Sequence, residues 1–195
     1  MEGGSSVPRE VNVYDFDNTI FRGDSTVRFL GFMLTRHPSL LRYVFVWAAA
    51  GARYALKKTD KTAMKQKIYS VFAPIGDTQE LVPEFWKRNK SRIKSFYYER
   101  HRDDDVVISA SPEFLLRGIC AELGVGKLIA SVVDPETGGY DGLNCHGEEK
   151  VRRFREELPD TEIAEFCSDS HSDDPLAAIA RRAFLVKGDR LTEWK

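Results

Sequence analysis

Short apolar runs that favour β-structure occur once near the N-terminus and then repeatedly after residue 105. These runs lie at 11–14, 106–109, 127–131, 163–168 and 183–186. Segments with a helical pattern separate the later runs, at 112–123, 148–158 and 176–183. Strands that alternate with helices are typical of a mainly parallel sheet with helices on both faces. The pattern therefore predicts an α/β fold of the Rossmann-like type.

The segment between the first two runs differs, because its pattern is helical throughout. Four helical stretches follow one another, at 25–36, 39–58, 60–72 and 78–101. Pro38 and Pro74 end the first and the third, since proline disrupts a helix interior. Asp77 and Glu80 have the spacing of a capping box at the start of the fourth. The first strand is thus followed by an insertion of helices.

This insertion divides the chain into two expected parts of opposite charge. We expect a catalytic core formed by residues 1–21 and 101–195, and an all-helical cap at 22–100. The cap carries 16 Lys and Arg against 6 Asp and Glu, whereas the remainder carries 13 against 24. A basic segment attracts phosphorylated substrates, nucleic acid or an acidic membrane surface. We expect no nucleic-acid partner, because there is no recognition motif and the acidic core would repel a phosphate backbone.

Local signals mark where the later helices start. Ser111 followed by Pro112 predicts an N-cap and a first helical residue. Asp174 and Pro175 repeat the same order before the last helix. Three glycines predict a turn region with a hairpin between the third and fourth runs, namely Gly138, Gly139 and Gly142.

The cysteines and the first ten residues indicate where in the cell the protein is expected. The three cysteines, Cys120, Cys145 and Cys167, are widely spaced and form no metal-binding or disulfide pattern, so we expect free thiols. Residues 1–10 lack the basic start and apolar stretch of a secretory signal. These features favour a cytoplasmic protein.

One stretch of the cap suits a membrane surface. Its uncharged run at 43–52 is ten residues long, short of the roughly 20 needed to cross a bilayer. Aromatic residues lie there among basic ones, namely Tyr43, Phe45, Trp47 and Tyr54 among Arg42, Arg53, Lys57 and Lys58. Such a mixture suits peripheral contact with an anionic membrane. The alternative is that the aromatic side chains form the core of the cap.

Polar residues follow the ends of several predicted strands, where an open parallel sheet binds its ligands. These are Asp15, Asp17, Asn18 and Thr19 after the first, Ser109 and Ala110 after the second, and 168–174 after the fourth; Lys150 opens a helix. Each signal alone has a simpler reading as a turn, a cap or a solvated helix face. Together they place carboxylates, a hydroxyl and an ammonium group at one edge of the sheet.

With these residues the chain resembles the haloacid dehalogenase-like superfamily of phosphohydrolases. DFDNT at 15–19 resembles its first motif, Ser109 its second, Lys150 its third, and Asp169 with Asp173 its fourth. The inserted helices resemble the C1-type cap of the phosphoserine phosphatase subgroup. The segments FLGFMLTRHPSLL, CHGEEK and CSDSHSDDPL are similar to the bacterial phosphatidylglycerophosphatase C type. Two positions depart from the family pattern, because Asn18 and Ser168 stand where glycine is usual.

The resemblance implies a role for each residue. Asp15 is the nucleophile that forms an aspartyl-phosphate, and Asp17 is the acid and base. Mg²⁺ is the implied cofactor, bound by the Asp15 carboxylate, the Asp17 backbone carbonyl and the Asp169 carboxylate. The implied phosphate-binding residues are Ser109, Ala110 and Lys150, and the supporting residues are Asp173, Thr19 and Ser170.

The implied activity is hydrolysis of a phosphomonoester, on an anionic lipid-headgroup phosphate such as phosphatidylglycerophosphate, at the inner face of a membrane. One alternative is a phosphatase for phosphoserine or another small metabolite. Against phosphoserine, Asp24 stands where that enzyme has a longer Glu. Another alternative is a non-catalytic module that binds anions.

Overall fold

The first strand lies in the interior of the sheet, because it pairs with another strand on each side. The computed structural model describes residues 9–195, so most of the segment examined for a secretory signal lies outside the described residues. Six strands form one sheet in the order β3-β2-β1-β4-β5-β6. Their bounds are β1 Arg9–Tyr14, β2 Val106–Pro112, β3 Lys127–Ser131, β4 Thr161–Ser168, β5 Ala180–Lys187 and β6 Arg190–Glu193.

The first five strands are parallel and β6 is antiparallel to β5. The prediction of a mainly parallel α/β sheet is therefore confirmed. Strand β6 was not predicted. It forms because the chain reverses at Gly188, whose φ of 62° lies in the left-handed region that glycine adopts without strain.

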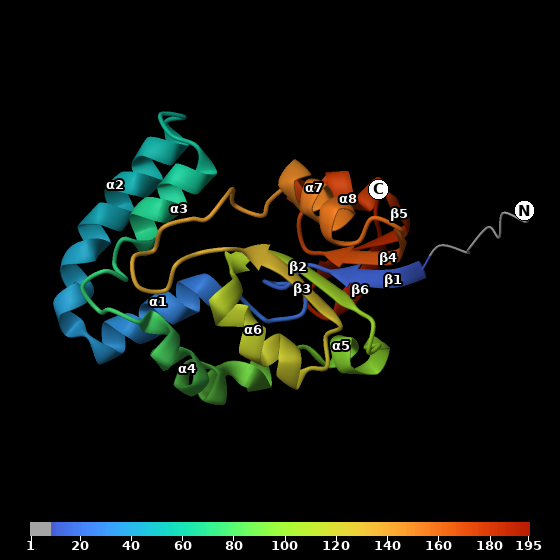
Figure 1. Cartoon of the computed structure of the whole chain (residues 1–195), viewed down its shortest axis with the longest axis horizontal. Coiled ribbons are helices and arrows are strands. Elements are labelled where there is room, and N and C mark those ends of the chain that lie inside the picture. Colours follow the sequence, from blue (N-terminus) through green and yellow to red (C-terminus); the bar gives the residue numbers. More distant parts are fainter. Residues whose placement is uncertain (1–8) are drawn as a thin grey trace, which may run out of the picture.

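Helices cover both faces of the sheet (Figure 1). α7 (Glu148–Glu157) and α8 (Asp174–Ala177) lie on one face, and α6 (Glu113–Glu122) on the other. Alternate side chains of β1 enter two separate cores, with Val11 and Val13 in one and Tyr14 in the other. This alternation is the pattern of a strand buried on both sides.

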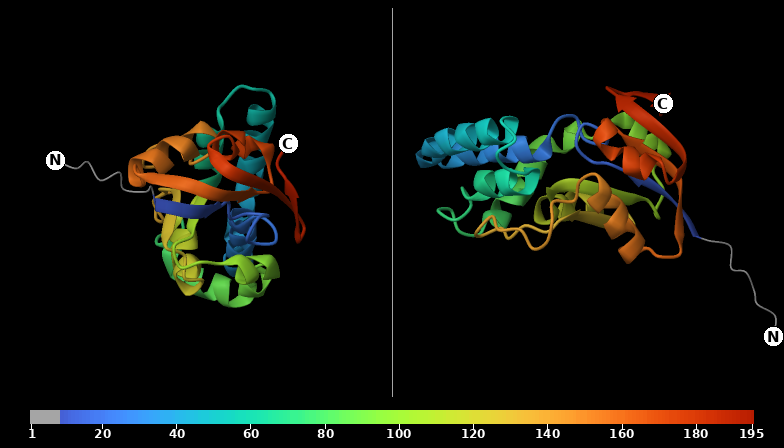
Figure 2. Two further views of the ribbon diagram at one scale, coloured as in Figure 1. Left: turned by 90° about the vertical axis from the view of Figure 1, so that its right-hand side faces the viewer. Right: turned by 90° about the horizontal axis from the view of Figure 1, so that it is seen from above.

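Helices fill the chain between β1 and β2, apart from isolated bridges at its ends. The α-helices are α1 Ser25–Arg36, α2 Tyr43–Ala55, α3 Lys61–Tyr69, α4 Val82–Asn89 and α5 Ser95–Arg100; the 3₁₀ helices are Pro38–Arg42, Thr78–Leu81 and Lys90–Arg92. Asp24 and Asp60 cap α1 and α3 by accepting hydrogen bonds from the N–H groups of Val27 and Ala63. α2 and α3 extend beyond one end of the sheet (Figures 1 and 2).

The fourth predicted helix, 78–101, is wrong as a single element. Asp77 accepts from the Gln79 N–H, and no return bond from Glu80 is present in the part of the chain described. The break comes at Ile93, which bridges to Phe21 in antiparallel fashion. Because Ile93 forms this bridge, its backbone is extended, and the helix cannot continue through it.

Three later predictions also need correction. Ser111 does not cap α6, because Pro112 precedes the first helical residue and the Ser111 hydroxyl donates elsewhere. The helix predicted at 176–183 ends at Ala177, since the following residues join β5 in the sheet. The predicted hairpin is a turn closed by the single bridge Val133–Tyr140.

The helical insertion and the sheet share one hydrophobic cluster. Phe29 of α1 packs on Phe85 of α4 and on Phe114 of α6. The Trp86 indole N–H donates to the Leu115 carbonyl oxygen at 2.6 Å, which joins α4 to α6. Because this packing is continuous, the division into a core and a cap at residues 22 and 100 stays a prediction.

The aromatic residues of the α2 stretch were expected either to contact a membrane or to form the core of the cap. The structure places two of them against the core and two on the surface. Tyr43 and Trp47 pack against the core, and the Trp47 indole N–H donates to the Ile68 carbonyl. Phe45 and Tyr54 instead face solvent, with Phe45 80% exposed. In residues 9–195, none of the helices has the length and apolar character that crossing a bilayer requires. All three cysteines are free, as predicted, and their side chains are buried.

Replacing Phe85 with alanine should lower the free energy of unfolding by about 3–5 kcal/mol, because a fully buried ring is lost at the junction of the helices. Chemical denaturation measures this change. Phe45→Ala is the matched control and should change stability by no more than about 0.5 kcal/mol, since the ring is exposed. Equal losses in the two variants would contradict this account of the core.

Candidate active site

The carboxyl ends of β1, β2 and β4 meet at one edge of the sheet, because these three strands are neighbours. A pocket of about 330 Å³ lies there. It is lined by residues that follow each strand, by the start of α7 and by the helical insertion. The predicted site residues that line it are Asp15, Asp17, Ser109, Ala110, Lys150, Asp169, Ser170 and Asp173.

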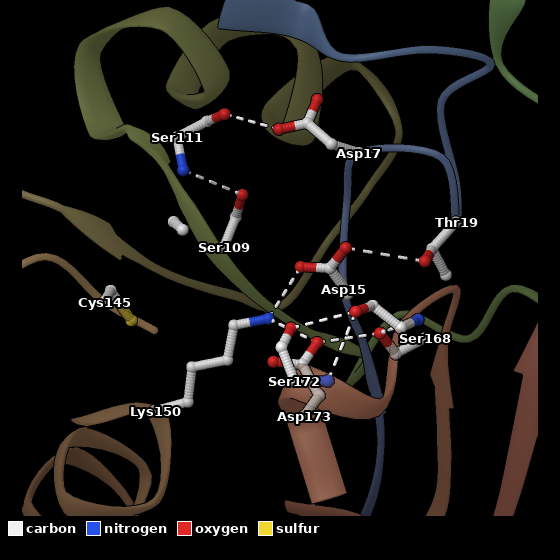
Figure 3. Close-up of polar contacts among 12 residues, drawn as sticks. Asp15, Asp17, Thr19, Ser109, Ser111, Cys145, Lys150, Ser168, Ser172 and Asp173 are labelled. Atoms are coloured by element: carbon white, nitrogen blue, oxygen red, sulfur yellow. Dashed lines mark hydrogen bonds and ion pairs between the residues drawn. The ribbon is translucent and has the colours of Figure 1, made fainter. Parts of the chain in front are cut away.

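A buried ion cluster forms the floor of this pocket (Figure 3). The Lys150 ammonium donates to Asp15 Oδ1 at 2.7 Å and to Asp173 Oδ2 at 2.8 Å. Ser168 Oγ donates to the same oxygen of Asp173 at 2.7 Å. Thr19 Oγ1 lies 3.5 Å from Asp15 Oδ2, the outer limit of a hydrogen bond. The cluster thus joins β1, α7 and the loop after β4.

Burial dominates the electrostatics of this cluster. It raises the pKa of Asp15 to about 7, although Lys150 opposes the shift. Burial lowers the pKa of Lys150, but Asp15 and Asp173 outweigh this effect and raise that pKa above its usual value. Lys150 is therefore held charged between two carboxylates.

Asp17 occupies a second position in the pocket, held by two donors. Its Oδ1 accepts from the Ser25 N–H at 2.6 Å, and its Oδ2 accepts from the Ser111 hydroxyl. Burial raises the pKa of Asp17 to about 6, and the nearby Asp24 adds to this increase. The side chain is thus fixed in direction and retains a proton more readily than a solvated carboxylate.

The remaining predicted residues lie around these two aspartates. Ser109 is fully buried and its Oγ accepts from the Ser111 N–H at 3.1 Å. Burial raises the pKa of Asp169. Ser170 uses its side chain within its own loop, since its Oγ accepts from the Ser172 N–H at 3.2 Å. Ser170 therefore shapes the loop after β4.

The two positions that depart from the family pattern have clear local functions. Asn18 has a φ of 57°, a region that asparagine tolerates better than most residues. Its carbonyl accepts from the buried Lys94 ammonium, which also donates to the Gly188 carbonyl at 2.6 Å. Ser168 supplies the hydroxyl that binds Asp173, which glycine could not do.

Several pocket residues were missed from the sequence. Lys61 and Lys65 of α3, together with His146, also line the pocket. The spacing of the two lysines, four residues apart, indicates a shared helix face. Ser111 was also missed as a partner of Asp17, because the pattern around it signalled only a helix start.

The oxygen atoms of this pocket fit a hard divalent cation. In residues 9–195, no three His, Cys, Asp or Glu side chains form a ready metal cluster. The metal-binding set predicted from the sequence contains only two carboxylates, those of Asp15 and Asp169, together with the Asp17 backbone carbonyl. Asp173 Oδ1 is buried without a hydrogen-bond partner among the described residues. An all-oxygen set of this kind suits Mg²⁺.

Comparison with known proteins gives the same assignment as the motifs. A family model for haloacid dehalogenase-like hydrolases matches residues 13–178. Protein CicA from Caulobacter vibrioides is 29% identical over 196 residues, covering 86% of this chain and 81% of the relative.

Solved structures share the fold at low identity. A Bordetella pertussis Tohama I protein of unknown function superposes with a TM-score of 0.75 at 22% identity, covering 91% of this chain and 89% of that one. A phosphoserine phosphohydrolase-like protein from Francisella tularensis gives 0.57 at 14%, covering 91% and 86%. A phospho-aspartyl intermediate analogue of phosphoserine phosphatase gives 0.55 at 17%, also covering 91% and 86%.

Lys150→Met should lower the free energy of unfolding by about 3–5 kcal/mol, because Asp15 and Asp173 would remain buried without their cation. Urea denaturation at neutral pH measures the loss. Arg152→Met, on the exposed face of the same helix, should leave the stability almost unchanged, because solvent screens its ion pairs. A Lys150 variant as stable as the Arg152 variant would refute the role of the ion cluster in stability.

Proposed function

The chain belongs to the haloacid dehalogenase-like hydrolases, and we propose that it hydrolyses phosphomonoesters through attack by Asp15. The observation that carries this proposal is that one pocket holds two carboxylates with different hydrogen-bond partners. Asp15 is held by the Lys150 ammonium, whereas Asp17 is held by the Ser111 hydroxyl and a backbone N–H. Such a pair suits a nucleophile beside a proton donor.

The first step is attack by an Asp15 carboxylate oxygen on phosphorus. The phosphorus–oxygen bond to the alcohol breaks, and the proton of Asp17 passes to the leaving oxygen. Lys150 fixes Oδ1 of Asp15, so the other oxygen remains available to react. The product of this step is an aspartyl-phosphate.

The second step is attack by water on the phosphorus of the aspartyl-phosphate. Asp17, now unprotonated, accepts a proton from this water, and the bond to Asp15 breaks to release inorganic phosphate. The need for Asp17 favours ester hydrolysis over dehalogenation, since a carbon–halogen bond has no leaving oxygen to protonate. The phospho-aspartyl analogue solved for a structural relative supports the same intermediate here.

We propose Mg²⁺ as the cofactor, bound by the Asp15 and Asp169 carboxylates and the Asp17 backbone carbonyl. When bound, Mg²⁺ neutralises phosphoryl oxygens, so that an anionic nucleophile can approach. Ser109 and Lys150 hold the phosphoryl oxygens by hydrogen bonding, with the backbone of Ala110 beside them.

We propose that the alcohol belongs to an anionic lipid headgroup, such as that of phosphatidylglycerophosphate. Support comes from the exposed apolar residues of α2 and the segments beside it, here termed the α2 face, namely Leu41, Val44, Phe45, Val46, Tyr54 and Leu56. Basic residues flank it, namely Arg42, Arg53, Lys57 and Lys58. An apolar surface edged by positive charge suits an anionic bilayer.

A phosphatase for phosphoserine is the second candidate, supported by the structural relatives of that name. Asp24 lines the pocket and offers a carboxylate for the substrate amine. This carboxylate already caps α1, however, by accepting from the Val27 N–H. A non-catalytic anion-binding role is less well supported, because it leaves the paired aspartates without a purpose.

Asp15→Asn should reduce phosphate release by roughly 10³-fold or more, because the amide is a poor nucleophile. Phosphate release is measured with Mg²⁺ on phosphatidylglycerophosphate, phosphoserine and a sugar phosphate at equal concentration. The wild-type protein should prefer the lipid, and excess EDTA should abolish its activity.

Asp174→Asn is the matched control, since this carboxylate is exposed at the start of α8 and accepts from the Trp194 indole N–H. It should retain activity within about threefold. Full activity of the Asp15 variant, or no hydrolysis of any of the three esters by the wild type, would refute the function. A preference for phosphoserine would refute the lipid assignment alone.

Phe45→Asp should weaken binding to anionic vesicles by about tenfold or more, because a charge replaces the most exposed aromatic ring of the α2 face. Sedimentation with phosphatidylglycerol vesicles measures the binding, and phosphatidylcholine vesicles should bind less. Tyr98→Asp is the control, because Tyr98 is 60% exposed on α5, away from α2 (Figure 1). If both variants sediment like the wild type, the α2 face does not contact the membrane.

A further inference from the structure

Two lysines of α3 face the pocket from the helical insertion. Lys61 and Lys65 are one helical turn apart and both line the pocket that holds Asp15 and Lys150. Within residues 9–195, no carboxylate lies at ion-pair distance from either ammonium group. Cations that are partly or largely buried without a carboxylate partner are costly, so they indicate an anionic ligand.

Lys65 is fixed in place by neutral acceptors. Its ammonium donates to the Ala110 carbonyl at 2.7 Å and to Asn144 Oδ1 at 3.1 Å. The Ser131 hydroxyl donates to the same Asn144 oxygen, at 3.3 Å. An ammonium group has three N–H donors, so these two bonds leave one for a ligand. Lys65 is thus oriented before any ligand arrives.

Charges of both signs surround Lys65. Burial lowers the pKa of Lys65 to about 8 and Lys61 lowers it further, whereas Asp24 and Asp17 oppose the shift. His146 responds to the same environment, because burial and then Lys61 lower its pKa to about 4. His146 is therefore neutral near pH 7, whereas Lys65 retains most of its charge there.

These lysines differ from Lys150 in what they contact. Lys150 is engaged by Asp15 and Asp173 on the sheet side of the pocket. Lys61 and Lys65 belong to the helical insertion, where Leu30, Met64 and Ile68 provide apolar lining. A ligand group at these lysines therefore lies on the side of the pocket formed by the insertion, where the alcohol of a substrate would extend.

We propose that Lys61 and Lys65 form a subsite for a second anionic group, carried by the alcohol part of the substrate. This inference rests on the proposed phosphatase function and specifies its substrate class. The substrate is a phosphomonoester whose alcohol bears a phosphodiester or a carboxylate. A monoester without such a group binds through its phosphoryl group alone.

The test uses the full-length protein with Mg²⁺ and three soluble esters. Deacylated phosphatidylglycerophosphate carries a phosphodiester, phosphoserine a carboxylate, and p-nitrophenyl phosphate no second anion. Lys65→Met and Lys61→Met should each lower kcat/KM for the preferred two-anion ester by about 10- to 100-fold, the effect of losing a charge-assisted hydrogen bond. Activity on p-nitrophenyl phosphate should change less than about threefold.

Lys67→Met is the matched control, because Lys67 is exposed on the same helix and does not line this pocket. It should leave both activities unchanged. Equal losses on all esters would overturn the proposal, since the lysines would then act on the transferred phosphoryl group. Unchanged kinetics in both variants would overturn it as well.

The outcome separates this inference from the proposed function. If the wild type hydrolyses none of the esters, the phosphatase function fails first. If it hydrolyses them and the lysine variants show no selective loss, only the second-anion subsite fails. A selective loss on the phosphodiester ester, or on phosphoserine, supports the subsite and identifies which anion it takes.

Discussion

The buried contact of Lys150 with Asp15 and Asp173 is the constraint on which the rest of the site depends. One ammonium group contacts two carboxylates, one directly after β1 and one in the short 3₁₀ helix after β4. Burying these charges is tolerable only if all three remain in contact, because an isolated buried charge is strongly unfavourable. This requirement sets the position of α7 relative to β1 and to the loop after β4.

The sheet order makes this contact possible. Strands β2, β1 and β4 are adjacent, so their carboxyl ends bring together residues that are 94 or more positions apart, such as Asp17 with Ser111 and Asp15 with Lys150. The helical insertion completes the pocket from the other side with Lys61 and Lys65. The proposed reacting groups thus lie at the ends of strands and in the segments after them, whereas the lysines of the proposed second-anion subsite belong to the insertion.

Much of the fold was predictable because local patterns agree with it. The runs at 11–14 and 127–131 read as short buried strands, and the helix at 25–36 was predicted with its observed bounds. Errors arose where tertiary contacts override local preference. The bridge of Ile93 to Phe21 divides a predicted helix, and pairing in the sheet converts part of the last helix into β5. β6 is short and polar, so only its pairing with β5 defines it.

The sequence by itself determined the alternation of strands and helices, and it singled out polar residues at the strand ends, because both depend on neighbours along the chain. Only the tertiary structure decided which side chains meet. Ser111 was predicted as a helix cap and is a partner of Asp17, while Lys65 had no predicted role and lies in the pocket. The physical reason is that hydrogen bonding and burial depend on residues distant in sequence, which no local pattern encodes.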